Sequence, residues 1–375
     1  MGKSIKQLTI DSKGKQLDFT LLFVVLVLLF IGLVALSSAS SYYALTEFND
    51  SSYYIVRQIA FAVVGIIGML IVSKIDYKQY LKFGYLIYGV GILLMLMVFV
   101  PGIGGTVNGA NRWLNLGFMR FQPSEIMKLC LIIGLSTYIE KNQVKMKTIK
   151  GYLVPALMLG LVCLIMYFQD HMSGMIVMLV LGATIIFING IKIKTRYLVI
   201  GIIAIVAVAA IFLLGDSYRL ERVTSFMNPE ADTTGSNWQP IQSLYAIGTG
   251  GLFGRGLGQS RQKYLWLPEA QNDFIFSVYA EEFGFVGCIV VLALYGFFVT
   301  RGLVIAMKSK NKYGTLIAGS IITMFAFQVI VNIAVVTVSM PTTGMPLPFF
   351  SAGGTSLLIN LAAVGLVLNI SRQGK

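Results

Sequence analysis

The sequence predicts an all-α, polytopic integral membrane protein with ten transmembrane helices. Of its 375 residues, 56% are hydrophobic and only 12% are charged, whereas a typical soluble domain carries about twice that charged share. The apolar residues also form long uninterrupted runs, and a helix needs roughly 20 such residues to cross the hydrocarbon core of a bilayer. Composition and run length therefore indicate the same fold class.

Ten runs have a suitable length. The first follows a basic N-terminus, but it is too long for the apolar part of a cleaved signal peptide and lacks a clean cleavage site. We therefore predict that it is the first transmembrane helix. The ten expected spans cover residues 18–38, 55–73, 83–101, 124–140, 152–169, 172–189, 198–215, 274–300, 315–339 and 351–371.

The positions of lysine and arginine predict the orientation of these helices. Most of the 29 basic residues fall in segments on the same side as the N-terminus, and cytoplasmic connections are the ones rich in Lys and Arg. Both termini are therefore predicted to be cytoplasmic. The net charge of +13 follows from this topology and from contact with anionic inner-leaflet lipid, so we expect no nucleic-acid partner.

Two extracellular connections are long. They cover about residues 102–123, between helices 3 and 4, and about 215–272, between helices 7 and 8. Long loops in compact proteins are usually functional or disordered, and the aromatic and aliphatic residues of the second favour an ordered structure. Residues 239–247 fit a short amphipathic helix. No soluble domain is evident, so residues 1–375 are predicted to form a single membrane domain.

Cysteine and histidine usage excludes several kinds of site. Cys130, Cys163 and Cys288 all fall inside apolar runs, which argues against a disulfide framework and against a thiolate metal site. His171 is the single histidine, so a zinc site with several histidine ligands is excluded.

Asp273 is the strongest candidate for a catalytic residue. It lies where the long loop enters the eighth apolar run, and a carboxylate kept at the edge of a membrane usually serves a substrate, an ion or a proton. Partial burial raises a carboxyl pKa toward a value useful for a general base. A helix N-cap is the alternative role, because Asp is a favoured capping residue.

The first long loop and the helix after it supply candidate substrate-binding residues. Arg112 can bind a phosphate or pyrophosphate through two hydrogen bonds, and Trp113 suits a sugar face or a membrane interface. Glu125 and Lys128 are three residues apart and therefore share a helix face. They either line a site or form a mutually neutralising buried pair.

Two further segments are unusual for membrane helices. Residues 340–354 contain three prolines and three glycines, which forbid a continuous helix; irregular backbone at membrane depth is tolerated only against protein or a water-filled cavity. Glu281 and Glu282 are adjacent acids within the eighth run. They suit a proton or ion path, or a structural tie to Arg57 or Lys128.

These segments together resemble the SEDS family (shape, elongation, division and sporulation), which comprises FtsW, RodA and SpoVE proteins. The resemblance covers nearly the whole chain and rests on ten spans and three ordered motifs. The motifs are NGANRW (108–113) with FQPSE (121–125), LPEAQNDFIF (267–276) with EEFG (281–284), and PLPFFSAGGTSL (346–357).

The resemblance implies a peptidoglycan glycosyltransferase that polymerises lipid II at the outer face of the bacterial plasma membrane, during cell division or related wall synthesis. It also implies a class B penicillin-binding protein as partner, within the division or elongation machinery. The family's essential aspartate corresponds to Asp273, its Arg-Trp pair to Arg112 and Trp113, and its Glu and Lys in helix 4 to Glu125 and Lys128.

Details place the chain nearer one branch of the family and leave some roles open. Residues 262–263 and 271–272 read Gln-Lys and Gln-Asn, as in the division and sporulation branch. Members of the family often have a proline followed by Asp, Asn or His at the start of helix 6, and residues 169–174 contain no proline here. Arg261, Lys263 and Glu269 are further candidate substrate ligands. A divalent cation such as Mg²⁺ or Mn²⁺ is another source of positive charge for the leaving pyrophosphate.

Two other functions compete with glycosyl transfer. A lipid II flippase would also contain intramembrane charges, here Glu125, Lys128, Glu281 and Glu282, although a transporter needs polar groups along its whole path. A non-catalytic scaffold for a penicillin-binding protein is the third reading. Asp273 and an ordered loop on one side of the membrane favour the enzyme.

Overall fold

The computed structural model describes residues 17–107, 110–115, 120–190 and 237–374. Nine of the ten expected spans coincide with helices, and the tenth, 198–215, lies outside the described residues. Seven of the described helices are long and apolar enough to cross a membrane. The nine helices are α2 (Phe19–Phe48), α3 (Tyr53–Val72), α4 (Tyr77–Leu96), α5 (Pro123–Lys141), α6 (Leu153–Phe168), α7 (Met172–Ile188), α11 (Ile275–Met307), α12 (Lys312–Val336) and α13 (Gly354–Gln373).

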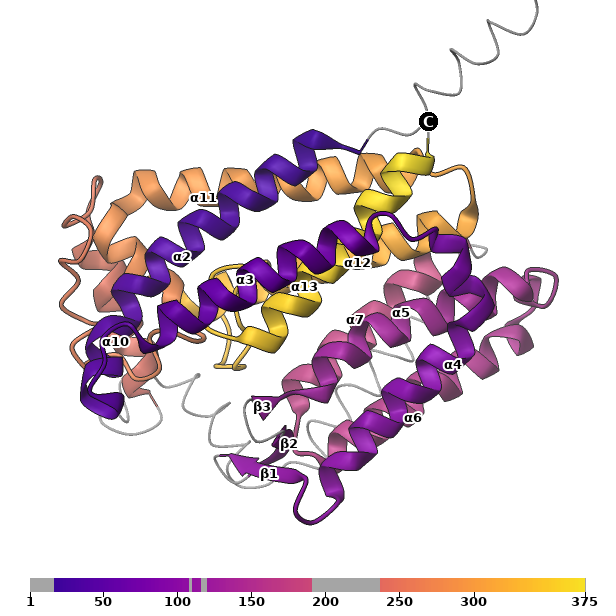
Figure 1. The fold of residues 1–375 in the computed structure, drawn as a ribbon, viewed down its shortest axis with the longest axis horizontal. Helices are drawn as coiled ribbons and strands as arrows, with labels where there is room; N and C mark the ends of the chain where they lie inside the picture. Colours follow the sequence, from indigo (N-terminus) through magenta and orange to yellow (C-terminus); the bar gives the residue numbers. More distant parts are fainter. Residues whose placement is uncertain (1–16, 108–109, 116–119, 191–236, 375) are drawn as a thin grey trace, which may run out of the picture.

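Helix α5 lies at the centre of the bundle. It packs against α4, α6, α7, α12 and α13, and Figure 1 shows it among these helices. Most of its residues are buried. Glu125 and Lys128 therefore face protein instead of lipid, and this is why a helix with these charges in its first turns is tolerated in a membrane protein.

The described beginning and end of the chain lie together. The main-chain N–H of Asp18 donates to Ser371 Oγ at 3.3 Å, and Arg301 Nη2 lies 2.6 Å from Asp18 Oδ2. The β-sheet and the short helix α10 (Trp238–Thr249) lie at the other end of the bundle (Figure 1). The expected helix over 239–247 is thus confirmed as α10.

The expectation of an all-α fold is wrong in one respect. The first long loop contains an antiparallel three-stranded sheet in the order β1-β2-β3. Pairing between the strands gives their main-chain N–H and C=O groups hydrogen-bond partners within the protein. Leu114 pairs with both Gly104 and Phe121 and is buried. The strands are β1 (Gly104–Val107), β2 (Ala110–Asn115) and β3 (Arg120–Phe121).

Helix α2 continues ten residues beyond the expected end at residue 38. The polar run after that point contains serines whose hydroxyls bond backward into the helix. Ser40 Oγ donates to Leu36 O at 2.7 Å, and Ser41 Oγ donates to Ser38 O at 3.0 Å. Because the helix carbonyls satisfy these hydroxyls, the serines need no partner outside the helix and do not end it.

Helix α11 was expected to be continuous, but it breaks at Gly284, where φ is 67° and ψ is −168°. The glycine-rich segment 250–256 packs into the break. The N–H groups of Arg255 and Gly256 donate to Glu281 O and Glu282 O, each at 3.0 Å. These bonds satisfy carbonyls that a broken helix would otherwise leave free.

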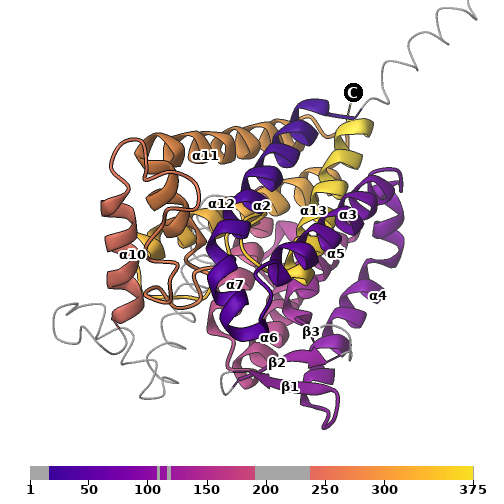
Figure 2. The same cartoon turned by 60° about the vertical axis from the view of Figure 1, so that its left-hand side comes forward.

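The second half of α11 is bonded in the same way. The N–H groups of Phe285 and Val286 donate to Gly251 O at 2.9 Å and Leu252 O at 3.1 Å. Figure 2 shows α10 close to the bent end of α11. The loop after α10 therefore replaces a turn of helix, and the break is a built feature of the fold.

Candidate functional site

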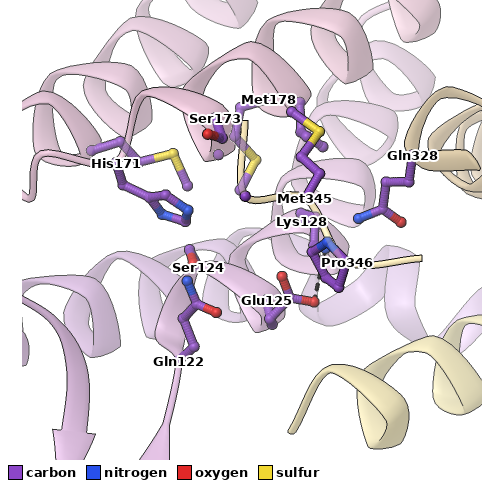
Figure 3. A pocket seen from close by; sticks show the side chains of 14 residues that line it. Gln122, Ser124, Glu125, Lys128, His171, Ser173, Met178, Gln328, Met345 and Pro346 are labelled. Carbon is purple, nitrogen blue, oxygen red and sulfur yellow. Dashed lines mark ion pairs between the residues drawn. The ribbon is translucent and has the colours of Figure 1, made fainter. Parts of the chain in front are cut away.

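A small cavity lies where α5, α7, α12 and the segment before α13 meet; we call it the α5–α7 cavity. Its volume is about 40 Å³, enough for one or two water molecules. Figure 3 shows Glu125 and Lys128 entering from α5 and Gln328 from α12. The remaining labelled lining residues are Gln122, Ser124, His171, Ser173, Met178, Met345 and Pro346.

The wall of this cavity holds a buried ion pair. Lys128 Nζ lies 2.8 Å from Glu125 Oε2, and both side chains are largely inaccessible. The predicted shared helix face is confirmed. Helix α5 begins with Pro123 in its first turn, which fixes the backbone there and leads Glu125 into the bundle. Since burying either charge alone would be strongly unfavourable, each requires the other.

The turn between α6 and α7 brings a neutral imidazole to the same cavity. Nδ1 of His171 is inaccessible to solvent and has no hydrogen-bond partner among the described residues. Burial, together with the positive charges of Arg112 and Lys128, lowers the pKa of His171 from 6.5 to about 3. His171 is therefore uncharged at neutral pH and offers the cavity a neutral polar ring.

Arg112 connects the β-sheet to this turn. Its Nη2 donates a hydrogen bond to the main-chain oxygen of Asp170. Trp113, the next residue of β2, is half-buried and pairs with Gly105 of β1. The sheet therefore carries the Arg-Trp pair to the α6–α7 turn, beside His171.

Asp273 lies next to Gly344, one of the residues that line the α5–α7 cavity. Helix α11 begins at Ile275 with Phe274 as its N-cap residue, so Asp273 lies one position before the cap. Asp273 Oδ2 faces Gly344, where an added Cβ would lie 3.4 Å from that oxygen. Gly344 lines the cavity. The tertiary structure thus brings the predicted base to the segment that borders Lys128.

Asn332 of α12 fastens this arrangement. Its Nδ2 donates to Asp273 O at 2.8 Å and to Met345 O at 2.9 Å. One buried side chain therefore ties the start of α11 to the segment that lines the cavity. Asn332 is not among the residues predicted from the sequence, although an amide inside the apolar run 315–339 is a signal for such a role.

Glu281 and Glu282 have different partners from those expected. Neither is tied to Arg57 or Lys128. Glu281 accepts from Ser260 Oγ at 2.6 Å and from the N–H of Arg261 at 3.0 Å. Both acids therefore bind the second long loop, because the break at residue 284 brings that loop against the helix.

Glu282 binds the only lysine of this loop. Lys263 Nζ lies 3.3 Å from Glu282 Oε1 and also donates to Gly258 O at 2.7 Å and to Ser38 Oγ at 3.0 Å. All three N–H donors of the ammonium group thus have acceptors within the protein. The pair fastens the loop to α2 and α11.

The other candidate ligands of the loop lie apart from the α5–α7 cavity. Arg261 is exposed. Glu269 is exposed and lines a second cavity of about 300 Å³, which we call the α2 cavity because Ala39 and Tyr43 of α2 form one side of it. Residues 263–271 of the loop form the other side. The predicted site residues therefore fall into three places: the α5–α7 cavity, the loop anchor at Glu281 and Glu282, and the α2 cavity.

No cluster of three or more His, Cys, Asp or Glu side chains suitable for a metal occurs in the described parts of the chain. A protein-only metal cage is therefore not formed by these residues. Mg²⁺ is commonly held by one or two carboxylates together with substrate phosphates, and the residues present would fit only that arrangement.

Comparisons with known proteins match nearly the whole length of the chain. The FtsW/RodA/SpoVE family model, described as a cell cycle protein, matches residues 19–375. The stage V sporulation protein E of Bacillus subtilis (strain 168) is 40% identical over 97% of this chain and 99% of its own length. A probable peptidoglycan glycosyltransferase FtsW of Trichlorobacter lovleyi is 40% identical over 95% and 93% of the two chains.

Solved structures agree with the sequence matches. One is a chain of a peptidoglycan synthase complex that coordinates polymerization and crosslinking, with a TM-score of 0.78, 29% identity, and coverage of 95% of this chain and 98% of that chain. Another is the rod shape determining protein RodA of Thermus thermophilus, with a TM-score of 0.70, 28% identity, and coverage of 95% and 97%. The chain is a multi-pass membrane protein that belongs to the FtsW/RodA/SpoVE family.

Proposed function

We propose that this protein is a peptidoglycan glycosyltransferase that polymerises lipid II at the outer face of the plasma membrane, in division or related wall synthesis. Relatives with 36–40% identity are named as probable enzymes of this kind. One structural observation carries the assignment to this chain. Asn332 holds Asp273 against the segment 344–346, which lines the same cavity as Lys128.

In the proposed reaction, Asp273 accepts the proton of a sugar hydroxyl while that oxygen attacks the anomeric carbon of the donor. The new C–O bond forms as the bond to the lipid pyrophosphate breaks, with inversion at carbon. General-base catalysis of this kind typically contributes about 10²–10⁴-fold. Asp273 is the only carboxylate that this step requires.

Positive charge must stabilise the leaving pyrophosphate. We propose Arg112 and Lys128 for this task, because Arg112 lies beside the α6–α7 turn and Lys128 lines the cavity. Arg261 is exposed on the loop and is a second contact for the phosphates. A divalent cation carried by the substrate would add charge there. Lys263 instead positions the loop, since Glu282, Gly258 and Ser38 occupy all three N–H donors of its ammonium group.

We also propose the finer topology. Ten spans form one membrane domain over residues 1–375, with both termini cytoplasmic and the loops 102–123 and 215–272 extracellular. The contact of Asp18 with Ser371 at one end supports this, as do the sheet and α10 at the other end.

The partner that we propose is a class B penicillin-binding protein. The similar chain in a peptidoglycan synthase complex supports a pairing of polymerisation with crosslinking. The sporulation and FtsW relatives favour the division or sporulation machinery over the elongation machinery.

Polymerisation of labelled lipid II by the purified protein tests the proposal, with and without a class B partner. Asp273→Asn should lower the rate by at least about 10²-fold and leave the unfolding temperature unchanged. Asp50→Asn is the matched control, because Asp50 is exposed in the turn between α2 and α3. Full activity in Asp273→Asn would contradict the base assignment.

The same purified protein distinguishes a glycosyltransferase from a lipid II flippase and from a non-catalytic scaffold. A wild-type protein that makes no glycan under any condition would contradict the proposed function. Translocation of labelled lipid II across liposomes would then identify a flippase, and partner binding without translocation would identify a scaffold.

A further inference from the structure

Gln58 is the one polar residue in the buried stripe of α3. This stripe consists of Gln58, Ala62, Gly65 and Met69, and the side chain of Gln58 is 4% exposed. A polar side chain kept inside a transmembrane helix is usually tied to a polar partner and to function. The partners of Gln58 therefore indicate its role.

Gln58 binds the irregular segment that precedes α13. Its Nε2 donates to Ser351 O and its Oε1 accepts from the N–H of Gly353, each at 3.2 Å. Residues 341–353 form no helix or strand, so their main-chain groups need partners elsewhere in the protein. The amide of Gln58 supplies one donor and one acceptor and thereby fixes residues 351–353 relative to α3.

The residue between these two contacts reaches the loop that leads to Asp273. The N–H of Ala352 donates to Gln271 O at 2.9 Å, and Gln271 precedes Asp273 by two residues. Tyr54 lies one turn before Gln58 on the same face of α3 and hydrogen-bonds the side chain of Gln271. Helix α3 therefore holds Gln271 twice: Tyr54 binds its side chain, and Gln58 fixes the residues that flank its main-chain donor.

The main chain around Asp273 is thus attached to the irregular segment at two points. Asn332 joins Asp273 O to Met345 O, and Ala352 binds Gln271 O. Residues 345–352 must keep their shape for both attachments to hold at once. Asn332 supports one end of this segment and Gln58 supports the other.

We propose that Gln58 is a positioning residue for Asp273. This inference rests on the proposed function and adds to it a residue that lines neither the α5–α7 cavity nor the α2 cavity. Gln58 keeps the N–H of Ala352 directed at Gln271 O, and Gln271 in turn fixes the main chain that carries the base. A displacement of a reacting group by about 1 Å can lower a rate about 10²-fold. Removal of the Gln58 amide therefore lowers kcat and leaves KM unchanged.

The test compares kcat and KM for lipid II polymerisation between wild type and Gln58→Met, whose side chain has similar length but neither the donor nor the acceptor. We expect kcat to fall at least about tenfold while KM changes less than about twofold.

Asn369→Leu is the matched control. Asn369 of α13 is also buried, and it also pairs with main chain: its Oδ1 accepts from the N–H of Tyr77 at 2.9 Å and its Nδ2 donates to Ser73 O at 2.7 Å. Both variants lose one donor and one acceptor to main-chain groups, so their unfolding temperatures should fall by similar amounts. Only Gln58→Met should lose kcat.

A second pair of variants tests the other contact of α3. Tyr54→Phe removes only the hydroxyl that binds Gln271 and should lower kcat at least about threefold at unchanged KM. Tyr53→Phe is its control, because the ring of Tyr53 stacks on Phe48, and it should keep the wild-type kcat. If Gln58→Met does not fold, this pair decides the question.

Three results would overturn the inference. They are a wild-type kcat in Gln58→Met and Tyr54→Phe, an equal loss of kcat in Gln58→Met and Asn369→Leu, and a raised KM at unchanged kcat in Gln58→Met. The second result would indicate general destabilisation, and the third would indicate direct contact with the substrate. A wild-type protein that makes no glycan, or a fully active Asp273→Asn variant, would instead contradict the proposed function.

Discussion

Replacing Gly284 with alanine is expected to destabilise the protein and to abolish its activity. The φ of 67° and ψ of −168° at this position are open only to glycine. An added Cβ would lie 2.7 Å from the carbonyl carbon and oxygen of Leu252 and closer still to Gly254 N. Both neighbours are main chain, so the segment 250–256 would have to move as a unit.

The structure sets the size of the effect. Movement of that segment would break the four main-chain hydrogen bonds that join it to the carbonyls of Glu281 and Glu282 and to the N–H groups of Phe285 and Val286. At about 0.5–1.5 kcal/mol each, their loss amounts to roughly 2–6 kcal/mol. The strained backbone adds about 1–3 kcal/mol. We expect the free energy of unfolding to fall by at least about 3 kcal/mol.

Thermal unfolding in detergent and lipid II polymerisation measure the two outcomes. Gly296→Ala is the matched control, because Gly296 lies in the second half of α11 and an added Cβ there meets no atom within 4 Å. That variant should be neutral or slightly more stable, since alanine favours a helix over glycine by about 1 kcal/mol. Equal unfolding temperatures for the two variants would refute the role of the break.

Two further predictions concern the α5–α7 cavity. Asn332→Asp removes the donor to Asp273 O and Met345 O and should lower kcat at least tenfold with KM nearly unchanged. The control is Asn369→Asp, which removes a buried donor to Ser73 O and should leave kcat unchanged. An equal loss of kcat in both variants would contradict a positioning role for Asn332. The pKa of His171 in the folded protein is lowered to about 3, so the unfolded chain binds more protons than the folded protein between pH 6.5 and 3. The free energy of unfolding should therefore fall as the pH drops through this range, by up to about 1.4 kcal/mol per pH unit. A His171→Asn variant whose unfolding temperature has the same pH dependence as wild type would contradict this.

The sequence predicts the helices well because a bilayer imposes a simple rule. A run of about 20 apolar residues in lipid must form a helix, since no water is present to bond a free main chain. Nine expected spans lie on described helices for this reason. The pairing of Glu125 with Lys128 was also predictable, because a spacing of three residues places both on one helix face.

Features that depend on contacts between distant segments were not predictable. Hydropathy around Gly284 is continuous, so nothing local indicates the break in α11. The partners of Glu281 and Glu282 follow from that break, which brings the loop 258–263 to them. The β-sheet depends on hydrogen bonds between strands, and the length of apolar runs carries no information about such pairing.

The sequence alone determined the membrane fold, the family motifs and the identity of Asp273 as the leading candidate base, because apolar run length and local motif chemistry act over a few residues. The tertiary structure decided which groups surround Asp273. Asn332 reaches it from a helix 59 residues away along the chain. The packing of helices determines these neighbours, since hydrogen-bond partners and cavities arise only when segments far apart in the chain meet.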